Sequence, residues 1–293
     1  MGKLVVAAHG IGDHVPDFAA EWEAILRRNH PHGDFQVAGL WWHDVLQKVA
    51  EKYPIVEQQF AAALAQFGFA KLQEVLDSAG YAMVRELFMD VVVYIAMGDM
   101  THYIQTEVAL RLKRVIHDAG AQPEETLLIG HSLGAAVLPH VVWDERNHIG
   151  YIPYGGMLLL ASPLGIESPV PGVIRDLLGW MAGDSGMDRK AMLTAFAREW
   201  NEGDLCFLNN TRDVVCCDAR FAIGGVDKDL IPLRQGFNKE EIAVLNRENP
   251  GSVVRFAQGS ADPRDVVSNH AVTLYLERPE FQRAFAGMLG ETP

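Results

Sequence analysis

The residues whose types and spacing most clearly indicate catalysis surround one serine, Ser132. Ser132 is the central residue of Gly-His-Ser-Leu-Gly at residues 130–134, a Gly-x-Ser-x-Gly pattern. The apolar run at 127–129 predicts a strand before it, and the residues at 135–138 continue after it with helical spacing. A serine on so sharp a strand-to-helix turn is strained and exposes its hydroxyl at the edge of a sheet. This placement predicts that Ser132 is a nucleophile; the alternative is a serine that merely caps the following helix.

A serine hydroxyl becomes a good nucleophile only when a base removes its proton and an acid orients that base. Asp213 lies just beyond a predicted strand at 205–209, and His270 lies in the loop that follows the last predicted strand, at 252–257. The carboxyl ends of parallel strands lie along one edge of a sheet, where ligands bind. We therefore expect Asp213 and His270 to meet Ser132 at that edge, as acid and base.

Three other aspartates compete with Asp213 for the role of the acid, namely Asp218, Asp262 and Asp265. Asp213 is preferred because it lies nearest the end of a strand. Asp262 and Asp265 share the loop of His270, where an aspartate more commonly shapes a turn. Asp213 could itself cap the turn after its strand, and His270 could be an ordinary surface histidine.

The elements that must position these residues alternate between strand and helix. Short apolar runs predict strands at 4–8, 35–41, 126–130, 157–161, 205–209 and 252–257. Helical spacing occupies the intervals, and one closing amphipathic helix is expected at 272–289. The alternation predicts an α/β fold with a mostly parallel, doubly wound sheet flanked by helices.

A helical insertion interrupts this alternation at about residues 43–98, where apolar residues recur at helical spacing and no strand is expected. We expect it to form a cap above the strand ends. It could pack plainly on the sheet, or it could line an acyl pocket as a lid. A second flexible segment, rich in proline and glycine, is expected at about 163–187. Without a repeat or a clear linker, residues 1–293 are expected to form a single domain.

The composition excludes several classes of function. The chain of 293 residues has a net charge of −13 and no Lys/Arg cluster, so neither a nucleic-acid surface nor a polybasic lipid-binding surface is expected. No apolar run approaches the ~18 residues of a transmembrane helix, and no signal peptide is recognisable. The three cysteines, two of them adjacent, suit a reducing compartment, so a cytoplasmic location is expected. The oligomeric state is left open.

Metal and cofactor sites are not expected. The pairs Asp99/His102 and His43/Asp44 have the right residue types for metal ligands, but their spacing matches no standard zinc or calcium motif. The adjacent Cys216 and Cys217 are expected to fill space beside the acid rather than to carry redox chemistry.

Together these motifs resemble the α/β-hydrolase superfamily, of the serine esterase/lipase type. The matching segments span nearly the whole chain and are His9–Gly12, Gly130–Gly134, Ala161–Gly165, Asn209–Val214 and Ser268–Ala271. The order of Ser132, Asp213 and His270 along the chain is the order expected of that superfamily. The resemblance implies that Ser132 is the nucleophile, Asp213 the acid and His270 the base. It also implies that the first strands of the full fold are absent, since the chain begins at what would be a later core strand.

The resemblance further implies an oxyanion hole made by the backbone N–H groups of Leu133 and Ile11. Ile11 follows His9 and Gly10 in the glycine-rich loop after the first predicted strand. Gly10 and His131, which adjoin these positions, are the candidate substrate-binding residues. A packing role is the alternative for His131, and His9 is expected to pack against the oxyanion loop.

The predicted function is hydrolysis of carboxylic esters by a Ser-His-Asp triad through an acyl-enzyme. The partner would be a small-molecule or lipid ester, bound without a cofactor. Because one triad serves several acyl groups, cleavage of an amide, a thioester or a phospholipid acyl ester is an alternative. A non-catalytic α/β-hydrolase-like protein that binds a small molecule or a partner is a further alternative. The sequence leaves the acyl length and the leaving group open.

Overall fold

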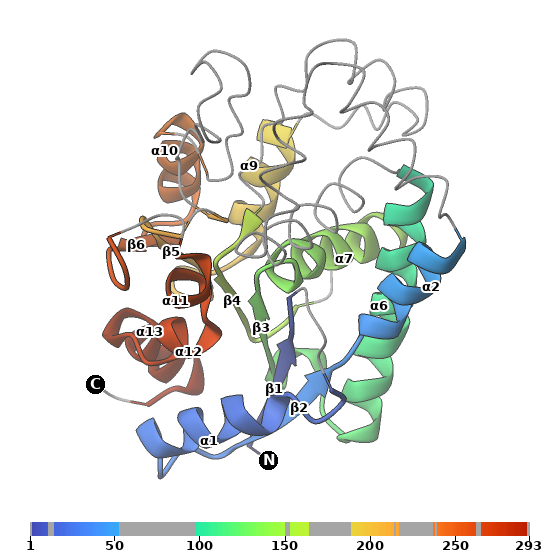
Figure 1. The fold of residues 1–293 in the computed structure, drawn as a ribbon, viewed down its shortest axis with the longest axis horizontal. Coiled ribbons are helices and arrows are strands. Elements are labelled where there is room, and N and C mark those ends of the chain that lie inside the picture. The colour runs from blue at the N-terminus through green and yellow to red at the C-terminus, as the bar shows by residue number, and fades with distance from the viewer. Residues whose placement is uncertain are drawn as a thin grey trace.

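A parallel β-sheet with helices on both faces forms the framework of the chain (Figure 1). The computed structural model describes residues 2–10, 15–52, 98–149, 153–163, 189–213, 215–216, 237, 239–261 and 265–291. This α/β architecture confirms the predicted fold class.

The sheet has six strands, and each lies where an apolar run predicts it, to within one or two residues at its ends. The strands are β1 (Lys3–Ala8), β2 (Phe35–Leu40), β3 (Thr126–His131), β4 (Gly156–Leu160), β5 (Leu205–Asn210) and β6 (Val253–Phe256). Their order is β2-β1-β3-β4-β5-β6, and every neighbouring pair is parallel. Strands β1, β3, β4 and β5 are almost wholly buried, which explains why they are continuously apolar rather than alternating.

The winding of the sheet reverses at β1. Strand β2 lies on one side of β1, and all later strands lie on the other. The connections after β1 and β3 therefore leave in opposite directions, and ligands bind open α/β sheets at such a point. Ala8 is paired with Gly130 in the register of β1 and β3, so the loop after β1 and the turn after β3 begin side by side.

Helices cover the two faces of the sheet in separate groups (Figure 1). One group consists of α2 (His43–Lys52), α6 (Gly98–Asp118), α7 (Gly134–Ile149), α9 (Arg189–Glu199) and α10 (Lys239–Glu248). The other consists of α1 (Ala19–Asn29), α12 (Val272–Leu276) and α13 (Pro279–Leu289). Leu4 and Val6 of β1 pack on the first group, whereas Val5 and Ala7 pack on the second. The short elements η1 (Pro123–Glu125) and α11 (Val266–His270) complete the description.

The single closing helix expected at 272–289 is wrong, because two helices occupy this range. Helix α12 ends at Leu276, and α13 begins at Pro279. Arg278, between them, has φ −70° and ψ 136°, an extended conformation. The ring of a proline disfavours the helical conformation in the residue before it, so Pro279 forces the break.

The loop expected around His270 is also wrong, because His270 is the last residue of the short helix α11. The side chain of Asp265 accepts a hydrogen bond from the Ser268 N–H at 3.2 Å and so caps the start of this helix.

The two expected insertions lie largely outside the described residues. Helix α2 begins the first at His43, and α6 begins at Gly98, but 53–97 are not described. The same is true of 164–188 in the second. The cap, the lid and the single domain therefore stay predictions. Within the described part of the chain, no helix combines the length and the apolar character needed to cross a membrane.

Candidate active site

Ser132 sits on a strained turn between β3 and α7. Its φ is +56°, in the left-handed region that costs a residue other than glycine about 1–2 kcal/mol. Its N–H donates to the Leu160 carbonyl of the neighbouring strand at 2.9 Å, and its own carbonyl accepts from the Ala135 N–H at 2.9 Å. These bonds hold the serine in the turn. The exposed hydroxyl expected from the sequence is wrong, because only 2% of the surface of Ser132 is exposed and its Oγ is buried. Strain of this kind is concentrated at functional sites.

The two glycines of the pattern are required by close backbone contacts. A Cβ atom added at Gly130 would lie 2.7 Å from the Gly134 carbonyl oxygen. A Cβ atom at Gly134 would lie 2.5 Å from the carbonyl oxygens of both Ala8 and His9. The turn is therefore packed directly against the end of β1, which the sequence pattern alone does not reveal.

The loop after β1 passes over Ser132. A Cβ atom added at Gly10 would lie 2.5 Å from the Ser132 Cβ and 3.0 Å from its Oγ. Glycine at this position lets the backbone approach the serine side chain. Gly10 therefore lies beside Ser132, but its contact with a substrate stays a prediction. Ile11 lies outside the described residues.

His9 anchors this loop. The Trp42 N–H donates to His9 Nε2 at 3.1 Å, so the ring proton is on Nδ1, which donates to the Gly10 carbonyl at 2.7 Å. The Trp42 indole N–H donates back to the His9 carbonyl at 3.2 Å, and the two rings stack at 5.4 Å. The imidazole is fully buried. These contacts agree with the expected packing role.

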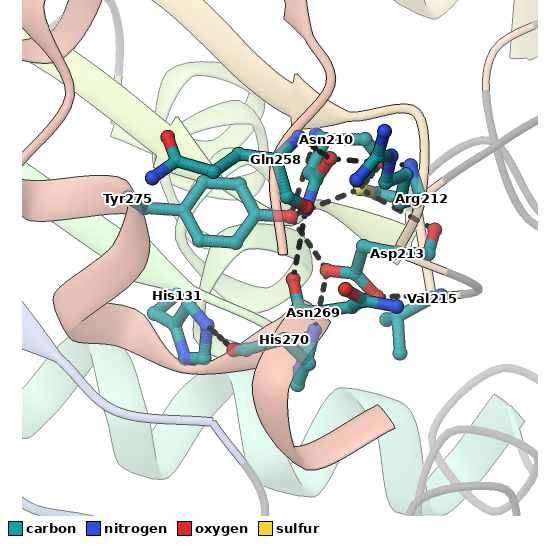
Figure 2. Close-up of polar contacts among 10 residues, drawn as sticks. His131, Asn210, Arg212, Asp213, Val215, Gln258, Asn269, His270 and Tyr275 are labelled. Atoms are coloured by element: carbon teal, nitrogen blue, oxygen red, sulfur yellow. Dashed lines mark hydrogen bonds and ion pairs between the residues drawn. The ribbon is translucent and has the colours of Figure 1, made fainter. Parts of the chain in front are cut away.

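Asp213 and His270 are joined by a short hydrogen bond (Figure 2). His270 Nδ1 lies 2.7 Å from Asp213 Oδ2, and the side chains are 11% and 0% exposed. The other carboxylate oxygen accepts the Val215 N–H at 2.9 Å. A carboxylate that holds Nδ1–H fixes the tautomer in which Nε2 is free to accept a proton.

His131 connects this pair to Ser132. It directly precedes Ser132, and its Nε2 donates to the His270 carbonyl at 2.9 Å. The His131 and His270 rings are 4.7 Å apart, and the rings of Trp22 and Tyr275 pack edge-on against His131. A contact between His131 and a substrate stays a prediction. The observed contacts are those of a packing residue that positions the end of α11.

Two buried polar atoms at this site have no hydrogen-bond partner among the described residues. They are the Ser132 Oγ and the His270 Nε2. Buried polar atoms are normally paired, so an exception calls for an explanation. Chemically, a hydroxyl and an imidazole nitrogen are a donor and an acceptor between which a proton can be transferred.

Asn210, at the end of β5, joins the loop that carries Asp213 to the segment that leads to His270 (Figure 2). Its amide NH2 donates to the carbonyls of Gln258 and Asn269 at 2.9 and 3.1 Å. Its side-chain oxygen accepts from the N–H groups of Arg212 and Gln258 at 3.1 and 3.2 Å. Asn269 immediately precedes His270, so this buried amide fixes the backbone on both sides of the Asp213–His270 pair.

Tyr275, like Asn210, is a residue of the site that could not be identified from the sequence. Its hydroxyl donates to Asp213 Oδ2 at 2.5 Å, the same oxygen that His270 contacts (Figure 2). The side chain is fully buried on α12. Burial, with smaller effects of Cys216 and Asp213, raises the pKa of Tyr275 well above its usual range.

The competing acids do not occupy this position where the structure describes them. Asp265 caps α11 through its contact with the Ser268 N–H. Asp218 and Asp262 lie outside the described residues.

No group of three or more His, Cys, Asp or Glu side chains that could hold a metal occurs within the described ranges. Asp44, a candidate metal ligand in the sequence, instead forms a bidentate ion pair with Arg111. The two guanidinium nitrogens lie 2.5 and 2.9 Å from the two carboxylate oxygens. Lys48 adds a third contact at 3.2 Å. The hydrogen bond from Arg111 is the main reason that the pKa of Asp44 is lowered to about 2.

Comparisons with known proteins give little more. No protein-family model matches the chain, and no curated protein matches it. Among solved structures, one match is described as RedJ with a PEG molecule bound in the active site. It is 14% identical, with a TM-score of 0.38, and the match covers 100% of this chain and 94% of that one. A TM-score this low carries no functional argument, so the site must be judged on its own geometry.

Proposed function

We propose that this chain is a serine hydrolase that cleaves carboxylic esters through an acyl-enzyme. Ser132 is the nucleophile, His270 the general base and acid, and Asp213 the residue that orients the imidazole. The backbone N–H groups of Leu133 and Ile11 form the oxyanion hole in this proposal.

One observation carries the proposal. The left-handed, buried Ser132 and the Asp213–His270 pair lie at the same sheet edge, and the Ser132 Oγ and the His270 Nε2 are left unpartnered within the described part of the chain. These are the two atoms between which the proton moves when a serine is activated. A serine that merely capped α7 would need neither the strained φ nor a histidine held by a buried carboxylate.

The reaction follows from these roles. His270 Nε2 takes the hydroxyl proton as the Ser132 Oγ attacks the ester carbonyl, and the negative charge develops on the carbonyl oxygen. Each oxyanion donor contributes about 3–4 kcal/mol to stabilising that charge. The imidazolium then protonates the departing alcohol, and the acyl group stays on Ser132. Water, deprotonated by the same imidazole, hydrolyses the acyl-enzyme.

The resemblance to the esterase/lipase type supports an ester over other acyl substrates. A series of p-nitrophenyl esters with increasing acyl length, assayed with the wild-type chain, tests the proposal. We expect hydrolysis of at least one ester, with kcat reduced more than about 10³-fold in Ser132→Ala and in His270→Ala. Hydrolysis that survives Ser132→Ala would contradict it. Activity confined to amide or thioester substrates would be consistent with the triad but would contradict the proposal that the substrate is a carboxylic ester.

A further inference from the structure

We propose that Tyr275 is a positioning residue for the Asp213–His270 pair, and that its hydroxyl sets how strongly Asp213 binds the imidazole. The inference rests on the proposed function, in which His270 is the base. It assigns to α12 a role that neither the sequence pattern nor the fold suggests.

The geometry centres on one oxygen atom. Asp213 Oδ2 receives the Tyr275 hydroxyl at 2.5 Å and the His270 Nδ1–H at 2.7 Å (Figure 2). The other oxygen of the same carboxylate is occupied by the Val215 N–H. The two side-chain donors therefore compete for the electron density of a single acceptor, and a change in one bond alters the other.

The phenol can act only as a donor to Asp213. Burial keeps it protonated, since the pKa of Tyr275 is raised well above its usual range. The backbone N–H of Asn210 points at the phenol oxygen at 3.4 Å, so that oxygen is already an acceptor on its other side. Cys216 Sγ lies 3.3 Å from the same oxygen. The proton of the hydroxyl is thus directed at the carboxylate.

Packing alone does not explain the hydroxyl. The ring of Tyr275 lies edge-on to Phe256 at 5.2 Å and to His131 at 5.9 Å. A phenylalanine would make both contacts. Burying a hydroxyl costs free energy unless it is hydrogen-bonded, and here its bond goes to the residue that orients the base.

The titratable groups around Asp213 come from three elements and its own loop. They are His270 on α11, Tyr275 on α12, His131 on β3 behind both rings, and Cys216 in the loop. The guanidinium of Arg212 points elsewhere, to the Gly259 carbonyl at 2.6 Å. Loss of the phenol donor therefore leaves His270 as the main side-chain donor to the carboxylate. The bond to the imidazole should become stronger, and the protonated imidazole should become more stable.

The direct test is proton NMR of the His270 Nδ1–H resonance, recorded across a pH titration and assigned by its absence in His270→Ala. In Tyr275→Phe we expect this resonance to move downfield. With an ester substrate, the midpoint of the acid limb of the pH–rate profile should rise by about half a pH unit. KM should not change, because the buried Tyr275 does not contact substrate. On the acid limb kcat should fall about threefold, which is the loss that a shift of half a pH unit produces.

A control and a second variant keep the test decisive. Phe256→Leu removes a ring that packs on Tyr275 without touching its hydroxyl, so it should lower the Tm and leave the resonance in place. Site-specific replacement of Tyr275 by a fluorinated tyrosine makes the phenol a stronger donor and should move the resonance upfield. If Tyr275→Phe does not fold, the fluorinated variant alone tests whether the phenol hydroxyl affects the His270 Nδ1–H resonance.

An unmoved resonance and an unmoved acid limb would overturn the inference and leave Tyr275 a packing residue. The NMR measurement requires no substrate. A chain that hydrolyses no ester but shows the shifts would therefore refute the proposed function alone, whereas hydrolysis without the shifts would refute only the role of Tyr275.

Discussion

His131 donates its Nε2–H to the backbone carbonyl of His270 at 2.9 Å, so the residue before the candidate nucleophile holds the backbone of the candidate base. The contact joins the last residue of β3 to the last residue of α11, which is 139 residues later in the chain. It explains how a histidine at the end of the short helix α11 keeps a fixed position beside Ser132.

Replacement of His131 should separate this positioning role from simple packing. His131→Phe keeps an aromatic ring between Trp22 and Tyr275 but leaves the His270 carbonyl without its donor, which costs about 1–3 kcal/mol. We expect kcat/KM for an ester to fall about tenfold or more. His131→Gln, which can still donate, should recover part of that loss. Equal activity of both variants and the wild type would show that the contact is dispensable.

The strained backbone at Ser132 predicts that two inactive variants at this position differ in stability. Glycine adopts a φ of +56° without the penalty that alanine pays, so Ser132→Gly should be more stable than Ser132→Ala by about 1 kcal/mol. Both variants should be inactive. Urea unfolding of the two proteins measures the difference, and an alanine variant as stable as the glycine variant would argue against a strained turn.

Asn210 offers a matched comparison with its neighbour Asn209. Asn210→Ala removes the donors to two carbonyls and the acceptor of two N–H groups, so we expect a loss of about 3 kcal/mol in the free energy of unfolding. Asn209 is also buried, but its side-chain oxygen has no partner within the described residues. Asn209→Ala should therefore cost less, and it should affect activity less. The reverse order in thermal or urea unfolding would show that Asn210 does not hold the Asp213 loop to the segment that leads to His270.

The Asp44–Arg111 ion pair predicts a dependence of stability on pH. The pKa of Asp44 falls from 3.8 to about 2 on folding, so the ionised carboxylate stabilises the fold. This contribution is complete well above pH 3.8 and is lost as the pH falls toward 2. The free energy of unfolding of the wild type minus that of Asp44→Asn should be constant near neutral pH and shrink in this window. A difference that does not change with pH would mean that the pair contributes nothing through its charge.

The centre of the sheet could be predicted from the sequence because its four inner strands are buried on both faces. All six residues of β3 and of β5 are buried, so each strand is a continuous apolar run with a polar residue at its end. The same logic places Ser132 and Asp213 just beyond strand ends, whereas His270 lies on α11, well after β6 has ended. The two-helix C-terminus could also have been predicted, since Pro279 marks the break, but the apolar spacing on either side suggested one helix.

Asn210 and Tyr275 could not be found in this way. Their long-range contacts join residues 48 to 65 positions apart, and no spacing or motif records such a pairing. Weak indications were present in the sequence. Asn210 is an amide at the end of a buried strand, and Tyr275 lies on the apolar face of a helix, where its hydroxyl needs a partner. Neither indication says which atom that partner is.

Covalent labelling by a fluorophosphonate probe tests the proposed nucleophile most directly. Attack by the Ser132 Oγ on phosphorus expels fluoride and adds the phosphonyl group to the serine, and peptide mass spectrometry then locates it. We expect one adduct, on Ser132, that is absent in Ser132→Ala and forms much more slowly in His270→Ala. A folded wild-type chain that is not labelled, or that is labelled at another residue, would contradict the proposal that Ser132 is an activated nucleophile.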